Sequence, residues 1–204
     1  MENPGAAAIV RGVEKASAPD PEVLGWISDT LRGNPQAFRG IVHRYQPLVL
    51  RLSLSYLGSP EEAEDATQEI FLKAYLSLPR FRLERRFVPW LYSIAVNHLK
   101  SRYARIRRVQ ERRSPGDPAD AIAAAAGRNG IPEAALEAAE LRRRVQEALR
   151  SLPGGVRDAA VLYYSEGLDV ASIAEALGIG LENVKSRLHR ARKLLRTLLE
   201  EDAT

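Results

Sequence analysis

Residues 170–196 read VASIAEALGIGLENVKSRLHRARKLLR, and their spacing is that of two short helices joined by a tight turn. Ala174 is small at the point where two such helices would approach closely, and Gly178 can adopt the positive φ that ends the first helix. Val184 would then anchor the second helix from beneath. The stretch therefore predicts a helix-turn-helix.

The second helix of this unit carries an apolar stripe on one side and basic residues on the others. The stripe recurs at alternating steps of three and four residues, through Leu181, Val184, Leu188, Ala191, Leu195 and Leu198. The remaining faces hold Lys185, Arg187, Arg190, Arg192, Lys193 and Arg196, with Ser186 and His189 among them. Such a helix has the shape and charge to lie in the major groove of DNA, although a run of charge is also typical of an ordinary solvated face.

The composition of the chain narrows the class of protein. Its 204 residues suggest one or two domains, and a hydrophobic content of 45% suffices for their cores. A net charge of +4 is a mild bias toward polyanions. The absence of cysteine excludes disulfides, cysteine-ligated zinc and a thiol nucleophile. Since no apolar run reaches membrane-spanning length and the first residues lack a signal-peptide core, we expect a cytoplasmic protein without membrane insertion.

The chain divides by composition into a tail, two helical domains and a linker. Residues 1–20 are rich in alanine, proline and glycine without a sustained period, which predicts a mobile tail. Residues 21–113 have a helical pattern nearly throughout, and helical periodicity resumes over residues 133–204. Residues 114–132 between them have the composition of a flexible linker. Because no strand alternation is evident, we predict an all-α fold of two small helical domains, the C-terminal one containing the helix-turn-helix.

Three helices are expected in the first domain. Asn34 followed by Pro35 is an N-cap with proline at the first helical position, and one face of this helix carries Phe38, Ile41, Val42, Tyr45, Val49 and Leu52. Ser59 caps a second helix that runs to about Leu78. A third helix begins near Pro89, after the basic loop RFRLERRFV.

The second of these helices is acidic along one side. Its polar face holds Glu61, Asp65, Gln68 and Glu69, and the residues available for packing are Ala66, Ile70, Leu72 and Tyr75. Such a face could dock a basic protein surface. Periodicity alone favours the simpler interpretation, in which the acids keep the helix soluble and complement its dipole.

The third helix combines polar, aromatic and basic residues. Trp90, Ser93, Asn97 and Ser101 follow one another at spacings of three, four and four, so they line one face, and Lys100 and Arg102 flank it. The loop before it interleaves Phe81 and Phe87 with arginines. Aromatic rings and cations together suit unstacked single-stranded bases. Trp90 could equally belong to the core, and His98 is expected to be structural.

Four motifs, taken in order, resemble those of the extracytoplasmic-function (ECF) sigma factors, small promoter-recognition subunits of bacterial RNA polymerase. They are EEAEDATQEIFLKAY, then PRF with FVPWLYSIAVN, then LRSLP, and finally NVKSRLHRARKLL. The resemblance spans roughly residues 22 to 200. It implies a subunit that directs core RNA polymerase to specific promoters and assists the initiation of transcription. It also implies a chain without catalytic residues, metal or cofactor, since the polymerase performs the chemistry.

The resemblance assigns roles to particular residues. It implies that the clamp helices of the largest catalytic subunit are bound by Asp65, Gln68 and Glu69. It implies that the first domain reads the minus-ten promoter element during melting, with Asn97 and Ser101 as base readers and a flipped base held by the loop. The other DNA contacts expected in this domain are Phe81, Arg85, Arg86, Trp90, Lys100 and Arg102. The helix-turn-helix is expected to read the minus-thirty-five element through Lys185, Ser186, His189 and Arg190.

The family resemblance also implies an anti-sigma factor as a partner. Three departures from the family pattern bear on promoter preference. One is the ERR of residues 84–86, which is more basic than the small polar loops common in the family and bears on which base is captured. Ser172 stands where many members have glutamate, and Asn183 stands where many have threonine.

The main alternative function is a helix-turn-helix regulator that binds DNA without polymerase, which would need a dimer for affinity. A protein-sequestering interaction module is a third candidate. An enzyme is disfavoured, because His43, His98 and His189 lie far apart without a nucleophile or metal motif around them.

Overall fold

The computed structural model describes residues 20–111 and 143–201, and within these ranges it contains helices and turns but no strand. The all-α prediction is therefore confirmed for the described part of the chain. The predicted linker, residues 114–132, and the predicted tail up to residue 19 lie outside the described residues.

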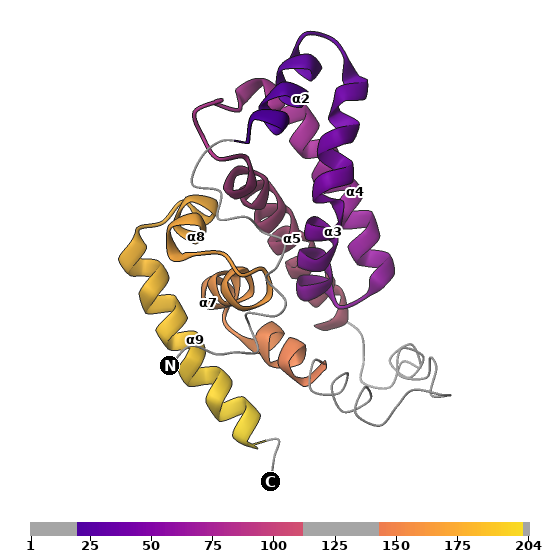
Figure 1. Cartoon of the computed structure of the whole chain (residues 1–204). Helices are drawn as coiled ribbons and strands as arrows, with labels where there is room; N and C mark the ends of the chain where they lie inside the picture. Colours follow the sequence, from indigo (N-terminus) through magenta and orange to yellow (C-terminus); the bar gives the residue numbers. More distant parts are fainter. Residues whose placement is uncertain (1–19, 112–142, 202–204) are drawn as a thin grey trace, which may run out of the picture.

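The helices form an N-terminal and a C-terminal half. The first comprises α2 (Pro21–Leu31), α3 (Phe38–Leu57), α4 (Pro60–Ser77) and α5 (Phe87–Glu111), with short 3-10 turns η1 (Pro35–Ala37) and η2 (Leu78–Arg80). The second begins with a helical stretch over residues 143–151 and continues through α7 (Gly154–Ala160), the π-helical segment η4 (Val161–Ser165), α8 (Val170–Leu177) and α9 (Leu181–Glu201). Figure 1 shows α5 lying between the α3–α4 pair and the C-terminal helices.

Local sequence signals set the helix boundaries in the N-terminal half. Asn34 accepts a hydrogen bond from the backbone N–H of Gln36 at 3.2 Å, and the turn that it caps leads directly into α3. Gly58 ends α3 in the left-handed conformation, at φ 78°. Ser59 then accepts a hydrogen bond from the N–H of Glu62 at 3.3 Å and caps α4. Both predicted caps are confirmed.

The core of the N-terminal half is built from one face of each of its helices. Fully buried apolar side chains come from α2, α3, α4 and α5, and the largest include Ile27, Ile41, Leu52, Ile70 and Leu91. The helix-face prediction for α3 holds, since the residues that it named are buried or partly buried. This core fixes α5 against α3 and α4.

The prediction that Leu72 packs in the core is wrong. Ala66 and Ile70 of α4 are fully buried, whereas Leu72 is 59% exposed. Two helical positions correspond to a rotation of about 200°, so a side chain two places after Ile70 leaves the opposite side of the helix. Tyr75 is also 37% exposed and places its ring edge-on to that of Phe38, with centroids 5.2 Å apart.

The predicted helix-turn-helix is present. Asp169 caps α8 by accepting a hydrogen bond from the N–H of Ser172 at 2.6 Å, and Gly178 ends it in the left-handed conformation at φ 64°. Val184, Leu188 and Ala191 of α9 are buried, as their stripe predicts. Leu181 departs from that prediction at 49% exposed, because it is the first residue of α9 and lies at the edge of the packed surface.

The two halves pack against each other in the described structure. Helix α8 lies against α5, and η4 lies against α3, so one continuous set of buried apolar residues includes members of both halves. Figure 1 shows the C-terminal helices gathered along one side of α5. The sequence did not predict this packing of the two halves. The packing determines which candidate site residues are exposed to solvent.

Candidate nucleic-acid interface

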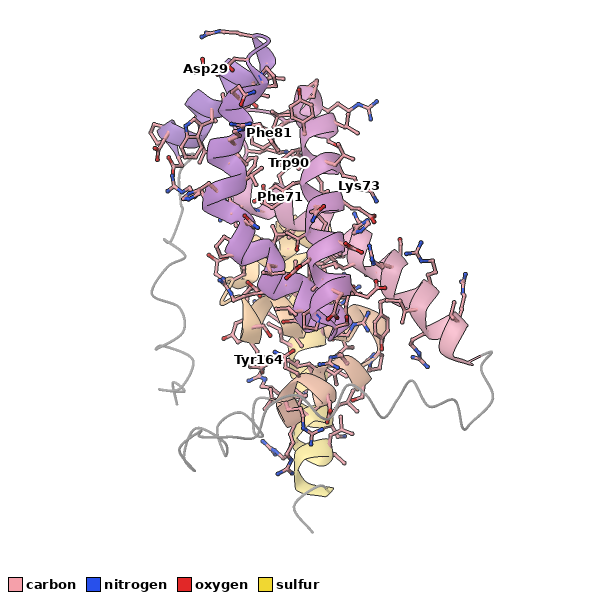
Figure 2. The ribbon with its side chains drawn as sticks, turned by 90° about the vertical axis from the view of Figure 1, so that its right-hand side faces the viewer. Asp29, Phe71, Lys73, Phe81, Trp90 and Tyr164 are labelled. Atoms are coloured by element: carbon pink, nitrogen blue, oxygen red, sulfur yellow. The ribbon has the colours of Figure 1, made fainter. Side chains whose placement is uncertain are left out.

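Aromatic rings cluster where the basic loop enters α5. The ring centroids of Phe81 and Trp90 are 4.9 Å apart, and those of Phe87 and Trp90 are 5.3 Å apart. Phe81 is only 7% exposed, and Trp90 is partly buried against the core. Figure 2 shows Phe81 and Trp90 next to each other within the N-terminal half. The structure therefore places Phe81 inside an aromatic cluster, where its face is not open to a base.

The predicted base readers lie on an exposed edge of α5. Asn97 and Ser101 are both exposed and sit one helical turn apart. The Ser101 hydroxyl donates a hydrogen bond to the backbone carbonyl of Asn97 at 3.1 Å. The same edge continues toward the exposed Arg105 and Arg108. This edge combines an amide, a hydroxyl and cations, the groups that contact base edges and phosphates.

Two cations that were predicted to bind DNA, Arg86 and Lys100, contact carboxylates of the C-terminal half. Arg86 donates from Nε and NH2 to a carboxylate oxygen of Glu175, at 3.1 and 2.8 Å, and from NH1 to the Ser172 hydroxyl at 3.1 Å. The Lys100 Nζ lies 3.0 Å from a carboxylate oxygen of Asp158. Arg85, by contrast, is exposed.

Arg102 lies elsewhere than the sequence analysis expected. Its side chain is 7% exposed and turns toward α4, where Nε donates to Glu62 at 2.6 Å and NH1 donates to Glu69 at 2.9 Å. NH2 lies 3.6 Å from Asp65. One residue corresponds to about 100° of rotation on a helix, so Arg102 leaves the face of Ser101 and joins the buried side of α5. Arg102 is therefore not available as a DNA contact, contrary to the prediction.

The predicted polymerase-docking residues share an exposed face of α4. The side chains of Asp65 and Glu69 are 68% and 52% exposed, and Gln68 between them is also exposed. The same face continues one and two turns further with Leu72 and Leu76, which are 59% and 67% exposed. Sequence reasoning missed these leucines as surface residues, although their spacing of four from Gln68 and from each other would have indicated it.

A buried histidine stands behind this acidic face. His98 Nε2 lies 3.3 Å from a carboxylate oxygen of Glu69, and Nδ1 lies 2.6 Å from the Nζ of Lys73. Figure 2 shows Lys73 on the outer side of α4. Burial, followed by the positive charge of Lys73, lowers the pKa of His98, and Glu69 opposes this shift only in part. His98 and Arg102 thus join α5 to the acidic side of α4.

The recognition helix presents the predicted upstream-element contacts together. Lys185, Ser186, His189 and Arg190 are all exposed on the first turns of α9. Lys185 forms an exposed ion pair with Glu182, at 2.7 Å. Arg187 turns the other way and donates to the backbone carbonyl of Gly155 at 3.3 Å. The exposed set has the geometry of a major-groove surface, since it occupies one side of the second helix of a helix-turn-helix.

Comparisons with known families match both halves. Residues 41–109 match the family described as Sigma-70 region 2, and residues 142–195 match the family described as Sigma-70, region 4. Over residues 20–111 and 143–201, no helix is both long and apolar enough to cross a lipid bilayer.

Similar proteins and structures extend this match over most of the chain. The ECF RNA polymerase sigma factor SigW of Bacillus subtilis (strain 168) is 33% identical over 187 residues, covering 86% of this chain and 95% of SigW. The ECF RNA polymerase sigma-E factor of Escherichia coli (strain K12) is 36% identical over 171 residues, covering 80% and 87%. The structure of CnrH in complex with the cytosolic domain of CnrY superposes with a TM-score of 0.66 at 25% identity, covering 89% of this chain and 99% of CnrH. The two family matches and these relatives show that the chain belongs to the ECF sigma factors of RNA polymerase, the subunits that direct the enzyme to promoters.

Proposed function

We propose a division of labour within this sigma factor. Residues 21–113 dock on core RNA polymerase and recognise and melt the minus-ten element, and residues 133–204 recognise the minus-thirty-five element. The observation that carries the proposal is the placement of three separate exposed surfaces, on α4, α5 and α9. The chain acts in the cytoplasm as a specificity subunit, and catalysis belongs to the polymerase.

The α4 surface suits a protein partner better than a nucleic acid. Asp65 and Glu69 give it negative charge, which would repel phosphates, and the exposed Leu72 and Leu76 give it apolar area. A mixed acidic and apolar face of this kind fits a helical protein surface with basic residues. Asp65, Gln68 and Glu69 are therefore assigned to the clamp helices of the polymerase, and the two leucines are added to that contact.

The DNA assignments rest on the other two surfaces. Asn97 and Ser101 read minus-ten bases from the exposed edge of α5, and Lys185, Ser186, His189 and Arg190 read the upstream element from α9. Each surface alone is small, so promoter affinity depends on polymerase holding both at the right spacing. An anti-sigma factor is the expected inhibitory partner. The sigma factor RpoE of Bartonella quintana, which has a similar fold, has been solved in complex with the anti-sigma factor NepR.

Reconstitution with purified core polymerase tests the docking assignment. The double variant Asp65→Lys/Glu69→Lys should lose co-purification with core polymerase and promoter-dependent transcripts from genomic fragments. The control Asp29→Lys/Glu147→Lys changes the net charge equally at exposed positions on other helices and should retain both activities. Equal polymerase binding by the two variants would exclude the α4 face as the docking surface.

A second experiment tests the α9 surface in the assembled holoenzyme. Lys185→Ala should weaken binding to the upstream element by about 1–3 kcal/mol if Lys185 contacts a base, or weaken binding evenly across sequences if it meets phosphate. The control is Lys193→Ala, an exposed lysine two turns further along α9. Unchanged affinity and selectivity in Lys185→Ala would remove this residue from the interface. Tight binding of one DNA sequence by the chain alone would favour a regulator that works without polymerase.

A further inference from the structure

The docking carboxylate of Glu69 has a lysine one turn further along the same helix. A glutamate followed by a lysine four residues later is the order that favours an ion pair on the surface of a helix. Glu69 and Lys73 of α4 have this order and spacing, and both are exposed. Such an ion pair would neutralise Glu69 and compete with a cation of the polymerase for its carboxylate.

Both residues lie in the described part of the chain, yet they do not form this ion pair with each other. The Nζ of Lys73 lies 2.6 Å from Nδ1 of His98, a residue of α5. The Glu69 carboxylate meets two α5 side chains instead, since Arg102 NH1 lies 2.9 Å from Oε1 and His98 Nε2 lies 3.3 Å from Oε2. One imidazole ring therefore contacts the lysine through one nitrogen and the glutamate through the other.

These contacts determine the tautomer of His98. An ammonium group has donors but no acceptor, so the Nδ1 atom beside Lys73 must supply a lone pair. The proton of a neutral ring then lies on Nε2, the nitrogen that faces Glu69. Burial and the positive charge of Lys73 lower the pKa of His98, which favours this neutral ring. Glu69 opposes the shift, and the charges of Arg102 and Arg105 add to it.

The buried Nε2 atom favours one orientation of the Glu69 side chain. His98 is 8% exposed, and its Nε2 has no hydrogen-bond partner among the described residues, so the Glu69 oxygen at 3.3 Å is a needed neighbour. Moving that carboxylate away would leave a buried N–H with no acceptor nearby, which is unfavourable. The Glu69 side chain is still 52% exposed, which leaves lone pairs of its oxygens for a cation of a partner.

We propose that His98 is a positioning residue for polymerase docking, whose neutral ring holds the Lys73 ammonium away from Glu69 and keeps the Glu69 carboxylate oriented for a cation of the polymerase. The inference rests on the proposed function of Glu69 as a docking residue. Because His98 is buried beneath the docking face, it acts through Glu69. A carboxylate that is oriented in advance needs less ordering when the partner binds.

The tautomer of His98 can be measured in the full chain without polymerase. Long-range proton–nitrogen NMR spectra distinguish a protonated from an unprotonated ring nitrogen, and the chain has only three histidines. The signals of His98 are those that disappear in His98→Asn. We expect the Nε2–H form, and Lys73→Met should raise the pKa of His98 because a neighbouring positive charge is removed. The Nδ1–H form would overturn the proposal, since Nδ1 would then have no lone pair for Lys73.

The affinity for purified core polymerase tests the consequence for docking. His98→Leu removes the acceptor, so Lys73 should pair with Glu69 and the affinity should fall about three- to tenfold, the range expected when one more side chain must be ordered on binding. His98→Asn keeps an amide oxygen near the place of Nδ1 and should retain most of the affinity. Urea unfolding followed by tryptophan fluorescence verifies that both variants are folded.

Removal of the lysine separates positioning from packing. In the His98→Leu background, Lys73→Met deletes the competing ammonium and should restore most of the lost affinity. The matched control is Lys193→Met in the same background, which removes an equal charge from an exposed lysine of α9 and should restore nothing. A ring that only filled space between α4 and α5 would not be replaced by a change at Lys73. Equal affinities with and without Lys73→Met would therefore overturn the positioning role.

The outcomes separate this inference from the docking assignment. If Asp65→Lys/Glu69→Lys binds polymerase as well as its control, Glu69 is not a docking residue, and the docking assignment and the role of His98 both fail. If that double variant loses binding while His98→Leu retains full affinity, the docking assignment stands and the role of His98 is overturned. The Nε2–H tautomer together with rescue by Lys73→Met supports the proposal.

Discussion

Replacing Arg102 with methionine separates its electrostatic role from its packing role. Methionine retains the apolar stem against α4 but deletes the guanidinium that reaches Glu62, Asp65 and Glu69. The variant should destabilise the N-terminal half and loosen the acidic face. Arg105→Met, at an exposed position of the same helix, is the matched control and should change stability by less than about 0.5 kcal/mol.

The magnitude follows from the contacts. Two of the three contacts are charge-assisted hydrogen bonds, at 2.6 and 2.9 Å, and each such bond contributes about 1.5–3 kcal/mol. The third contact, at 3.6 Å, adds little. Since the carboxylate side chains are 42–68% exposed, water replaces much of what the guanidinium supplied, and the net loss should be about 2 kcal/mol.

The chain provides its own probe for this measurement. Both of its tryptophans, Trp26 and Trp90, lie in the N-terminal half, so tryptophan fluorescence during urea unfolding reports on that half. A loss of about 2 kcal/mol lowers the unfolding midpoint by about 1 M urea when the slope is roughly 2 kcal/mol per molar. Polymerase affinity should fall in parallel with the stability. If Arg102→Met unfolds at the same urea concentration as Arg105→Met, the structural role assigned to the guanidinium is refuted.

Three further predictions concern packing and pH. Gly40→Ala should destabilise the N-terminal half by about 1–3 kcal/mol in thermal unfolding, because the added carbon would lie 2.5 Å from the Trp26 ring; Gly25→Ala, with nothing within 4 Å, should not destabilise it. Val184→Ala should lower the free energy of unfolding, measured by circular dichroism, by about 2–3 kcal/mol, because Val184 is fully buried. If this variant lost less stability than a variant with a substitution at an exposed position of α9, the packing of Val184 would be contradicted. Because the pKa of His98 is lowered in the folded state, the folded state binds fewer protons than the unfolded state at mildly acidic pH. The contribution of His98 to the free energy of unfolding is therefore complete above pH 6.5, and it is lost as the pH falls toward the pKa of His98 in the folded state. His98→Gln should therefore flatten the decline in the free energy of unfolding between about pH 7 and pH 5, and parallel declines would show that another group causes it.

The features that could be predicted from the sequence are the local ones. Asn34 and Ser59 cap helices through their own side chains, and Gly58 and Gly178 allow a backbone conformation that other residues avoid. These signals act over a few residues and need no knowledge of the rest of the fold. The buried stripe around Val184 was predictable for the same reason.

The interaction partners of the charged side chains could not be predicted from the sequence. Arg102 meets Glu62 across 40 residues, and Arg86 meets Glu175 across 89. A cation on a helix looks the same in sequence whether it will face a phosphate or a carboxylate, because the difference arises only when two distant elements pack. The same limit applies to Leu72, whose apolar character alone does not indicate which side of α4 it will occupy.

The buried link from α5 to α4 through Arg102 has a consequence for where transcripts begin. Because Arg102 ties α5 to Glu62 and Glu69 of α4 in addition to the shared apolar core, the proposed base-reading edge of α5 should keep a constant distance from the proposed docking face of α4. Lengthening the segment that connects the halves would then alter how far apart the two promoter elements can stand, while the first transcribed nucleotide would stay in place.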